Sequence, residues 1–210
     1  MHLFSRAVQF VGPVPEVMAY ATDIRQYVSE KAGQDIGLWQ VGFGAPLGSM
    51  VFTARVNGVA GVMELSSTFA DDAEYHAKLA KGAQFRGGPT MDSLGEPIHG
   101  DMDGDPPPVG SIASVTSAQI ATGKYADAFG WGVEVAQHIE KVSGVPMAFL
   151  QSVFGQFGAV TWIAVYPDAA AADAANAAVN GDEGYMKMIG DIGGMFVEGS
   201  GSQSMVVRVA

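Results

Sequence analysis

The sequence predicts an α+β protein built from two tandem units, each with the element order β-α-β-β-α-β. Three observations support this prediction. The second half of the chain repeats residues of the first at a nearly constant spacing, strand-like and helix-like patterns follow one another in the same order in both halves, and an acidic, proline-rich segment separates the halves. We therefore expect a first unit at residues 1–100, a linker at residues 101–109 and a second unit at residues 110–210.

The repeat is clearest at matched glutamine and glycine residues. Gln26 and Gln137 are separated by 137 − 26 = 111 positions, and Gly33 and Gly144 by 144 − 33 = 111. In the flanking stretches the spacing is 110, and one of the changes falls in the turn of a predicted hairpin, where an insertion disturbs a fold least. The spacing indicates a tandem duplication.

Each unit begins with a predicted strand, at residues 3–11 and 112–120, followed by a helix. The helices are predicted from apolar residues at helical spacing, which are Val17, Tyr20, Ala21, Ile24 and Val28 in the first unit and Ala128, Trp131, Gly132, Val135 and Ile139 in the second. Gly33 and Gly144 follow these helices and are predicted left-handed caps.

The remaining elements also occur twice. Strand pairs are predicted at residues 36–43 with 50–56 and at 147–154 with 160–166. Alanine-rich helices follow at 59–81 and 169–189, interrupted at 66–68 and 180–181. The second unit ends in a strand at 204–209, whose counterpart at 93–98 contains Gly95 and Pro97 and should be a poor or edge strand.

This element order is the ferredoxin-like motif, which forms one antiparallel sheet with helices on one face. The bare face must be covered, and the second unit is the natural cover. The chain thus resembles the dimeric α+β barrel superfamily, in which two such units pack sheet to sheet around a central cavity. That superfamily includes cofactor-free monooxygenases, EthD-like and NIPSNAP-like proteins, haem-handling enzymes of the chlorite dismutase type and members without known activity. The resemblance leaves open whether this protein is an enzyme.

Composition excludes several functions. The net charge of −11 disfavours nucleic acid and anionic membrane surfaces as partners. The absence of cysteine removes disulfides, thiolate metal sites and cysteine nucleophiles. No secretory signal and no membrane-spanning stretch is recognisable, so we predict a soluble, cytoplasmic protein.

Four residues are candidate ligand contacts. Arg6 and Arg55 fall on the first and third strands of unit 1, which are central neighbours in a ferredoxin-like sheet. We predict that they face the cavity and hold an anionic group, although they could instead pair with acidic residues or reach solvent. Gln40 and Gln151 match across the units and either line the cavity or satisfy buried backbone groups.

Tyr75, His76 and His138 are weaker candidates for hydrogen bonding or proton transfer. His138 aligns with Tyr27, so it is either a haem ligand or base, or a packed residue at a helix edge. Carboxylates alternate in the linker beside His99, but a solvated acidic segment explains them more simply than a metal site. We therefore predict no metal and no cofactor, with haem as an alternative.

The predicted function is binding of a small organic ligand, in the manner of a cofactor-free monooxygenase acting on an aromatic or other anionic substrate. Self-association is also expected. The alternative is a non-enzymatic structural protein that forms a defined homo-oligomeric assembly. A third reading is a haem-binding protein. A barrel interior filled by side chains would favour the structural alternative.

Overall fold

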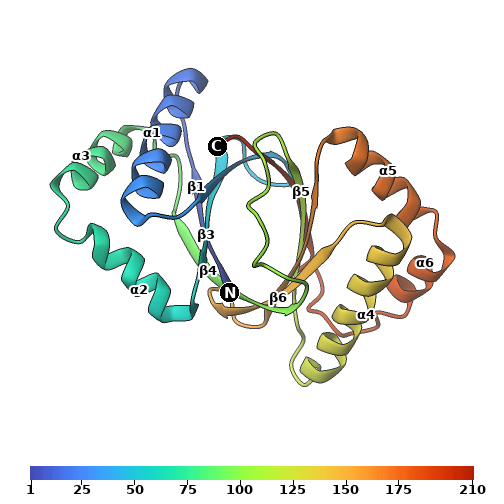
Figure 1. The fold of residues 1–210 in the computed structure, drawn as a ribbon. Helices are drawn as coiled ribbons and strands as arrows, with labels where there is room; N and C mark the ends of the chain where they lie inside the picture. The colour runs from blue at the N-terminus through green and yellow to red at the C-terminus, as the bar shows by residue number, and fades with distance from the viewer.

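A computed structural model of the chain describes residues 1–210 and shows a closed barrel between two helical layers (Figure 1). The first half contains β1 (His2–Gln9), α1 (Val14–Ala32), β2 (Ile36–Phe43), β3 (Ser49–Val56), α2 (Gly58–Phe69), α3 (Ala73–Gly82), a 3-10 turn (Ala83–Phe85) and β4 (Met91–His99). The second half contains β5 (Ile112–Gln119), α4 (Tyr125–Ser143), β6 (Met147–Phe154), β7 (Ala159–Tyr166), α5 (Ala169–Asn180), α6 (Glu183–Gly190) and β8 (Ser202–Arg208).

The strands follow one another around the barrel in the order β1-β3-β2-β8-β5-β7-β6-β4, and all neighbours are antiparallel. Each half supplies four adjacent strands in ferredoxin-like order. The halves meet at two edges, where β2 pairs with β8 and β4 pairs with β6. The predicted α+β class is confirmed, and the cavity is enclosed by continuous backbone pairing between the two sheets.

β4 differs from its prediction as a poor or edge strand. It is an edge only within its own half, because closure of the barrel pairs it with β6 as well as β1. The pairing of β4 with β6 is irregular near the glycine and the proline. Its register shifts between Leu94 and Gly95 and again between Pro97 and His99. Pro97 lies beyond the residues that pair with β1, so its missing N–H costs no bond there.

The first helix of each half packs on the outer face of its sheet as predicted. Val17, Tyr20, Ala21 and Ile24 are buried in α1, and Ala128, Gly132, Val135 and Ala136 in α4. Both helices end at a glycine with left-handed backbone, with φ of 64° at Gly33 and 72° at Gly144. These packed faces form the two larger hydrophobic clusters of the protein.

The second helix of each half is interrupted, as predicted. In the second half the break lies at residues 181–182, close to its expected place. In the first half it lies at residues 70–72, so the prediction of residues 66–68 was wrong. Ser67 and Thr68 lie within α2, and their hydroxyls donate to the carbonyl of Glu64 one turn earlier instead of competing for the backbone of a turn. Asp72 then starts α3 by accepting from the backbone N–H groups of Glu74 and Tyr75.

None of the helices is both long and apolar enough to span a bilayer.

Candidate ligand-binding cavity

The barrel interior is a cavity of about 1340 Å³. Side chains on a strand point alternately to its two faces, so every second residue faces inward. On β1 these are Leu3, Ser5, Ala7 and Gln9, and β3 contributes Ser49, Val51, Thr53 and Arg55. Serine, alanine, threonine, valine and glycine dominate the lining, and these small side chains leave the interior hollow.

One wall of the cavity is apolar. Trp39, Ala113 and Val206 form a buried cluster inside the barrel, against which Val41, Val51, Val115, Ile163 and Val165 pack. Trp39 donates its indole N–H to the hydroxyl of Thr53 at 3.0 Å. A second polar pair, the hydroxyls of Ser117 and Thr161, lies at 3.0 Å on strands of the other half. The lining is thus largely apolar with a few placed hydroxyl groups, as is common in ligand pockets.

The two ends of the barrel differ in charge and cover. At one end lie the start of β1, the end of β3 and the end of β8, and the linker at residues 101–109 covers this end. Figure 1 shows the linker crossing the barrel between the two helical layers. Met102, Pro106 and Pro107 of the linker contribute to the cavity lining. We call this the linker end.

At the opposite end, which we call the mouth, the β2–β3 and β6–β7 turns flank the cavity. Their tips carry the most exposed large apolar side chains of the chain, Leu47 at 92% and Phe157 at 84%. Phe43, Phe154 and Met91 are also exposed beside them. The mouth is therefore rich in apolar side chains, whereas the two arginines of the cavity, Arg55 and Arg208, lie at the linker end.

Arg208 and Arg55 lie together at the linker end but have different partners. The guanidinium of Arg208 is buried and donates to both carboxylate oxygens of Asp35, at 2.8 and 2.9 Å. It also donates to the carbonyl of Pro107 in the linker. Asp35 is further bound by Arg25. Arg208 is thus held in a fixed geometry by a carboxylate that it shares with Arg25.

Arg55 has no carboxylate partner. Its two terminal nitrogens donate only to linker carbonyls, those of Gly104 and Asp105. Its side chain lines the cavity, and the ion pairs of the structure do not include it. Arg55 is therefore an arginine of the cavity wall that no carboxylate pairs with directly.

Arg6 does not face the cavity, contrary to the prediction. It lies one position out of step with Ser5 and Ala7, so it points to the helical side of the sheet. There it forms a two-fold hydrogen-bonded ion pair with Asp92, at 2.8 and 2.7 Å, which raises the pKa of the guanidinium. Arg6 thus pairs with an acidic residue, which was the alternative expectation, and of the two arginines only Arg55 faces the cavity.

The two predicted glutamines lie in different places relative to the cavity. Gln40 is exposed and lies outside the cavity, between the inward-facing residues Trp39 and Val41. Gln151 borders the cavity, but its amide donates to Glu96 at 2.6 Å. Because Leu150 packs against Gly95 inside the barrel, alternation places the Gln151 side chain on the outer face. Neither amide is directed into the cavity.

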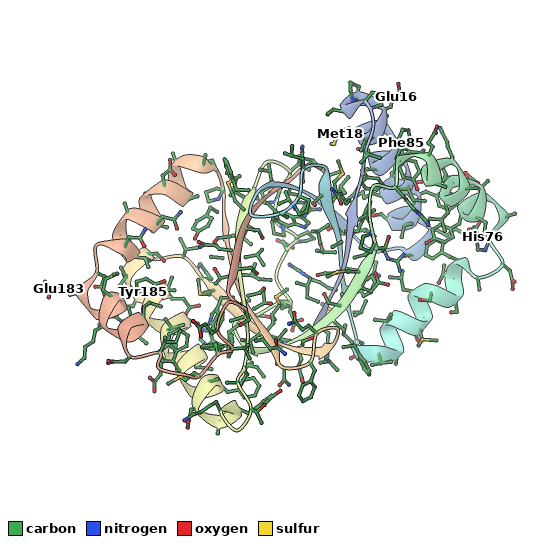
Figure 2. The ribbon with its side chains drawn as sticks, turned by 180° about the vertical axis from the view of Figure 1, so that it is seen from behind. Glu16, Met18, His76, Phe85, Glu183 and Tyr185 are labelled. Carbon is green, nitrogen blue, oxygen red and sulfur yellow. The ribbon has the colours of Figure 1, made fainter.

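Tyr75, His76 and His138 all lie in the helical layers outside the barrel. Figure 2 shows His76 at the outer surface of one layer and Tyr185, the counterpart of Tyr75, in the other. Tyr75 packs on Phe69 at 4.7 Å between ring centroids, and His76 contacts the carbonyl of Ala70. His138 bonds to Asp182, 2.6 Å away. The cavity thus contains none of the three predicted proton-transfer candidates.

Metal and haem sites can be tested against the donor groups present. No three histidine, aspartate or glutamate side chains converge anywhere in the structure. Asp103 of the linker pairs with the N-terminal amine at 3.3 Å, and His99 at the end of β4 pairs with Glu140. No histidine, tyrosine, lysine or glutamate lines the barrel cavity. The cavity therefore does not fit a haem held by a histidine ligand.

Sequence reasoning missed Arg208 and the cavity role of Trp39. Arg208 had a visible signal, because it is a lone charge in the apolar run of β8. Trp39 had a weaker signal, because it is a large side chain in a strand that also contains two glycines. Their convergence depends on the pairing of β2 with β8, which places Trp39 opposite Arg208. Only knowledge of that pairing between the two halves brings them into one site.

No family model matches this sequence, and no curated protein matches it. Solved structures do match it over almost its whole length. One is a protein from Fusobacterium nucleatum subsp. nucleatum ATCC 25586 provisionally assigned as a monooxygenase, with TM-score 0.65, 10% identity and coverage of 100% of this chain and 92% of that one. A second, provisionally assigned likewise, comes from Lactobacillus acidophilus NCFM, with TM-score 0.61, 14% identity and coverage of 99% and 93%.

A third match is an anthrone oxidase-like protein, with TM-score 0.63, 13% identity and coverage of 99% of this chain and 92% of that one. Identities this low show the fold alone and do not identify a substrate. Together with the closed eight-strand order, they establish that this chain has the dimeric α+β barrel fold, with both ferredoxin-like halves in one polypeptide.

Proposed function

We propose that this protein binds, inside its barrel, a small organic molecule with an aromatic or other apolar body and an anionic group. One observation carries the proposal: an apolar cavity of about 1340 Å³ ends at the guanidinium of Arg55, which has no carboxylate partner. A guanidinium matches the geometry of a carboxylate or sulfonate and binds it more strongly than it binds a neutral carbonyl.

The hollow interior favours binding over a purely structural role. Ligand cavities commonly measure about 300–1,000 Å³, so this interior has ample room for a drug-sized molecule. Along β3 the cavity runs from Ser49 at the mouth to Arg55 at the linker end. Six residue steps at roughly 3.3 Å each span about 20 Å. An elongated ligand can therefore place its anionic group at Arg55 and its apolar end at the mouth.

Two fluorescent probes test this proposal. Anilinonaphthalene sulfonate has an aromatic body and an anionic group, whereas N-phenyl-1-naphthylamine has a similar body without the charge. We expect both to bind the wild type. Arg55→Met should weaken sulfonate binding about tenfold or more, as for loss of a hydrogen bond to a charged group, and leave the neutral probe unchanged. Titration followed by fluorescence measures both affinities.

Arg6→Met is the matched control, because Arg6 carries the same charge but lies on the outer face of the sheet. It should leave both affinities unchanged. Equal binding of the sulfonate to wild type and Arg55→Met would remove Arg55 from the proposal. Failure of both probes to bind would contradict the binding function itself.

We further propose that the bound molecule is oxidised by molecular oxygen without a cofactor, which the monooxygenase and anthrone oxidase-like neighbours suggest. The cavity offers no histidine or tyrosine as a base, and its aspartates are held by Arg6, by Arg208 and by a backbone N–H of the linker. The chemistry therefore suits a substrate that loses a proton readily by itself. In such a substrate the enolate oxygen is the anionic group, and Arg55 would stabilise it as it forms. For anthrone, the CH₂ group becomes a carbonyl while O₂ ends as the new carbonyl oxygen and one water.

An oxygen electrode measures this activity directly. We expect oxygen uptake with anthrone above the rate without protein, and a lower rate for Arg55→Met than for Arg6→Met. Uptake no faster than in buffer would contradict the oxidation and leave the binding proposal standing.

A further inference from the structure

We propose that the linker at residues 101–109 is a displaceable strap, whose carbonyls occupy Arg55 until the anionic group of a ligand takes their place and releases the linker. This inference rests on the proposed binding function and adds its regulation. It starts from the only partners of Arg55, the carbonyls of Gly104 and Asp105. Both acceptors belong to the linker, so a ligand that competes for Arg55 competes with the linker.

The competition favours the ligand. A carboxylate or sulfonate brings a full negative charge to the guanidinium, whereas each backbone carbonyl brings only a dipole. The bonds from the guanidinium to the linker carbonyls are already charge-assisted, but a carboxylate can accept two parallel N–H bonds and adds the attraction of a full opposite charge. The linker is rich in carboxylates, yet none of them pairs with Arg55. The strongest acceptor for this arginine is therefore still missing when the linker is in place.

Charge repulsion acts in the same direction. Asp101, Asp103 and Asp105 lie in the segment that covers the linker end. An anion bound at Arg55 would cancel the positive charge that faces them and leave like charges close together. A neutral ligand of the same shape would do neither. The release is thus expected to depend on the charge of the ligand.

Few other contacts hold the linker. It has no helix or strand, and only Met102 and Pro107 are half-buried while the other residues are exposed. The ion pair of Asp103 with the N-terminal amine is exposed on both sides and stabilises little. Arg208, itself held by Asp35, donates to the carbonyl of Pro107 and anchors the linker there, so the part that can be released is residues 101–106. Segments with so few buried contacts open at low free-energy cost.

The absence of cysteine allows a site-specific probe of this motion. Gly104→Cys carries a nitroxide label in the linker, and a Cβ at Gly104 meets no atom within 4 Å. Gly130→Cys on α4 is the matched control, since it is exposed and equally free of neighbours. Electron paramagnetic resonance spectra then report the mobility of each label without ligand, with anilinonaphthalene sulfonate and with N-phenyl-1-naphthylamine.

We expect the sulfonate to sharpen the spectrum at position 104, and the neutral probe to leave it unchanged. Arg55→Met in the same background should give the mobile spectrum without any ligand. The label at position 130 should not respond. A second measurement needs no label. A protease specific for aspartate should cut the linker of the unlabelled chain faster when the sulfonate is bound, and faster in Arg55→Met than in the wild type.

The outcomes separate the two proposals. Sulfonate binding that depends on Arg55, without a change in linker mobility or cleavage, would overturn the strap and keep the binding function. An immobile, uncleaved linker in ligand-free Arg55→Met would also overturn the strap. Failure of the sulfonate to bind would overturn the binding function, and with it the release by ligand.

Discussion

In each half, an aspartate at a matched position connects the first helix with the start of the last helix. Asp72 connects α1 with α3, and Asp182 connects α4 with α6. Asp72 accepts from the hydroxyl of Tyr27 at 2.9 and 2.8 Å, and Asp182 pairs with His138 at 2.6 Å. Each aspartate also accepts the backbone N–H three residues later and so caps its helix. One aspartate position therefore works with a tyrosine in one half and a histidine in the other.

The different partners predict a pH-dependent stability. Lys31 at 2.9 Å, the N–H of Tyr75 and Tyr27 hold the pKa of Asp72 well below its ordinary value of 3.8. A depressed pKa stabilises the fold above the unfolded value, and this stability is lost as the pH falls through the folded value. Asp72→Asn should thus destabilise the protein at pH 7, and its difference from the wild type should shrink below about pH 4.

Urea denaturation between pH 7 and pH 2 measures that difference. Asp182→Asn is the matched variant, because the hydrogen bond from His138 likewise lowers the pKa of Asp182. A gap for Asp72→Asn that stays constant down to pH 2 would show that the carboxylate charge contributes nothing.

The sequence predicted on which strands the two arginines lie, but not to which face of the sheet each side chain points. Arg6 and Arg55 were correctly placed on central neighbouring strands, which pair side by side. Their faces could not be predicted, because β1 has apolar residues at successive positions, Ala7 and Val8, and shows no clean alternation. A shift of one residue moves a side chain to the other face. Arg6 therefore contacts Asp92 on the outside, while Arg55 reaches the cavity.

Among the elements, the packing of α4 on the sheet depends on a close approach at Gly132. A Cβ at this position would lie 2.3 Å from the ring of Phe149. That ring is fully buried and stacks on Trp162 at 4.8 Å between centroids, so it has no room to move. The backbone of Gly132 also accepts the indole N–H of Trp162.

Gly132→Ala should therefore destabilise the fold by about 1–3 kcal/mol, as for overpacking of a core. Gly130→Ala in the same helix meets no atom within 4 Å and should stabilise the protein by about 0.5–1 kcal/mol through helix propensity. Chemical denaturation measures both variants. Equal effects of the two substitutions would mean that the contact with Phe149 relaxes without cost.

Apolar periodicity located α1 and α4, each of which buries one face, and the repeated order of elements located most of the others. Boundaries were less predictable where local bonds compete. Serine and threonine at residues 66–68 resemble a helix break, but all three lie within α2, where two of their hydroxyls bond to the carbonyl of Glu64. β4 resembled an edge strand from its own sequence, and its second partner, β6, lies in the other half of the chain.

For the whole molecule, the two edges that join the halves predict cooperative unfolding. β2 pairs with β8 and β4 with β6, so neither sheet keeps its closed form without the other. Leu38 is fully buried in the first half, and Leu38→Ala should cost about 2–5 kcal/mol. If the halves unfold together, this loss must also appear in a signal from the second half.

Tryptophan fluorescence in a Trp39→Phe background provides that signal, because Trp131 and Trp162 then remain, both in the second half. Leu38→Ala should lower the fluorescence midpoint as far as the midpoint seen by circular dichroism. An unchanged fluorescence midpoint would instead show that the halves unfold independently.

The duplicated order of elements was enough to predict the barrel fold, since two half-covered sheets need each other. The hollow interior was not predictable in the same way. Its volume depends on which of two alternating sets of residues faces inward, and the sequence does not separate the small inward residues, such as Ser5 and Ala7, from their neighbours. The pairing of β2 with β8 joins residues from opposite ends of the chain, such as Trp39 and Arg208, which local patterns do not connect.

That same pairing has a consequence for synthesis on the ribosome. The partner of β2 along this edge is β8, whose first residue follows the last residue of β2 by 202 − 43 = 159 positions. At about 5–20 residues per second, the emerging chain exposes the free edge of β2 for roughly 10–30 s. An unpaired strand edge is a template for pairing with other chains. We therefore expect aggregation of unfinished chains to begin at β2.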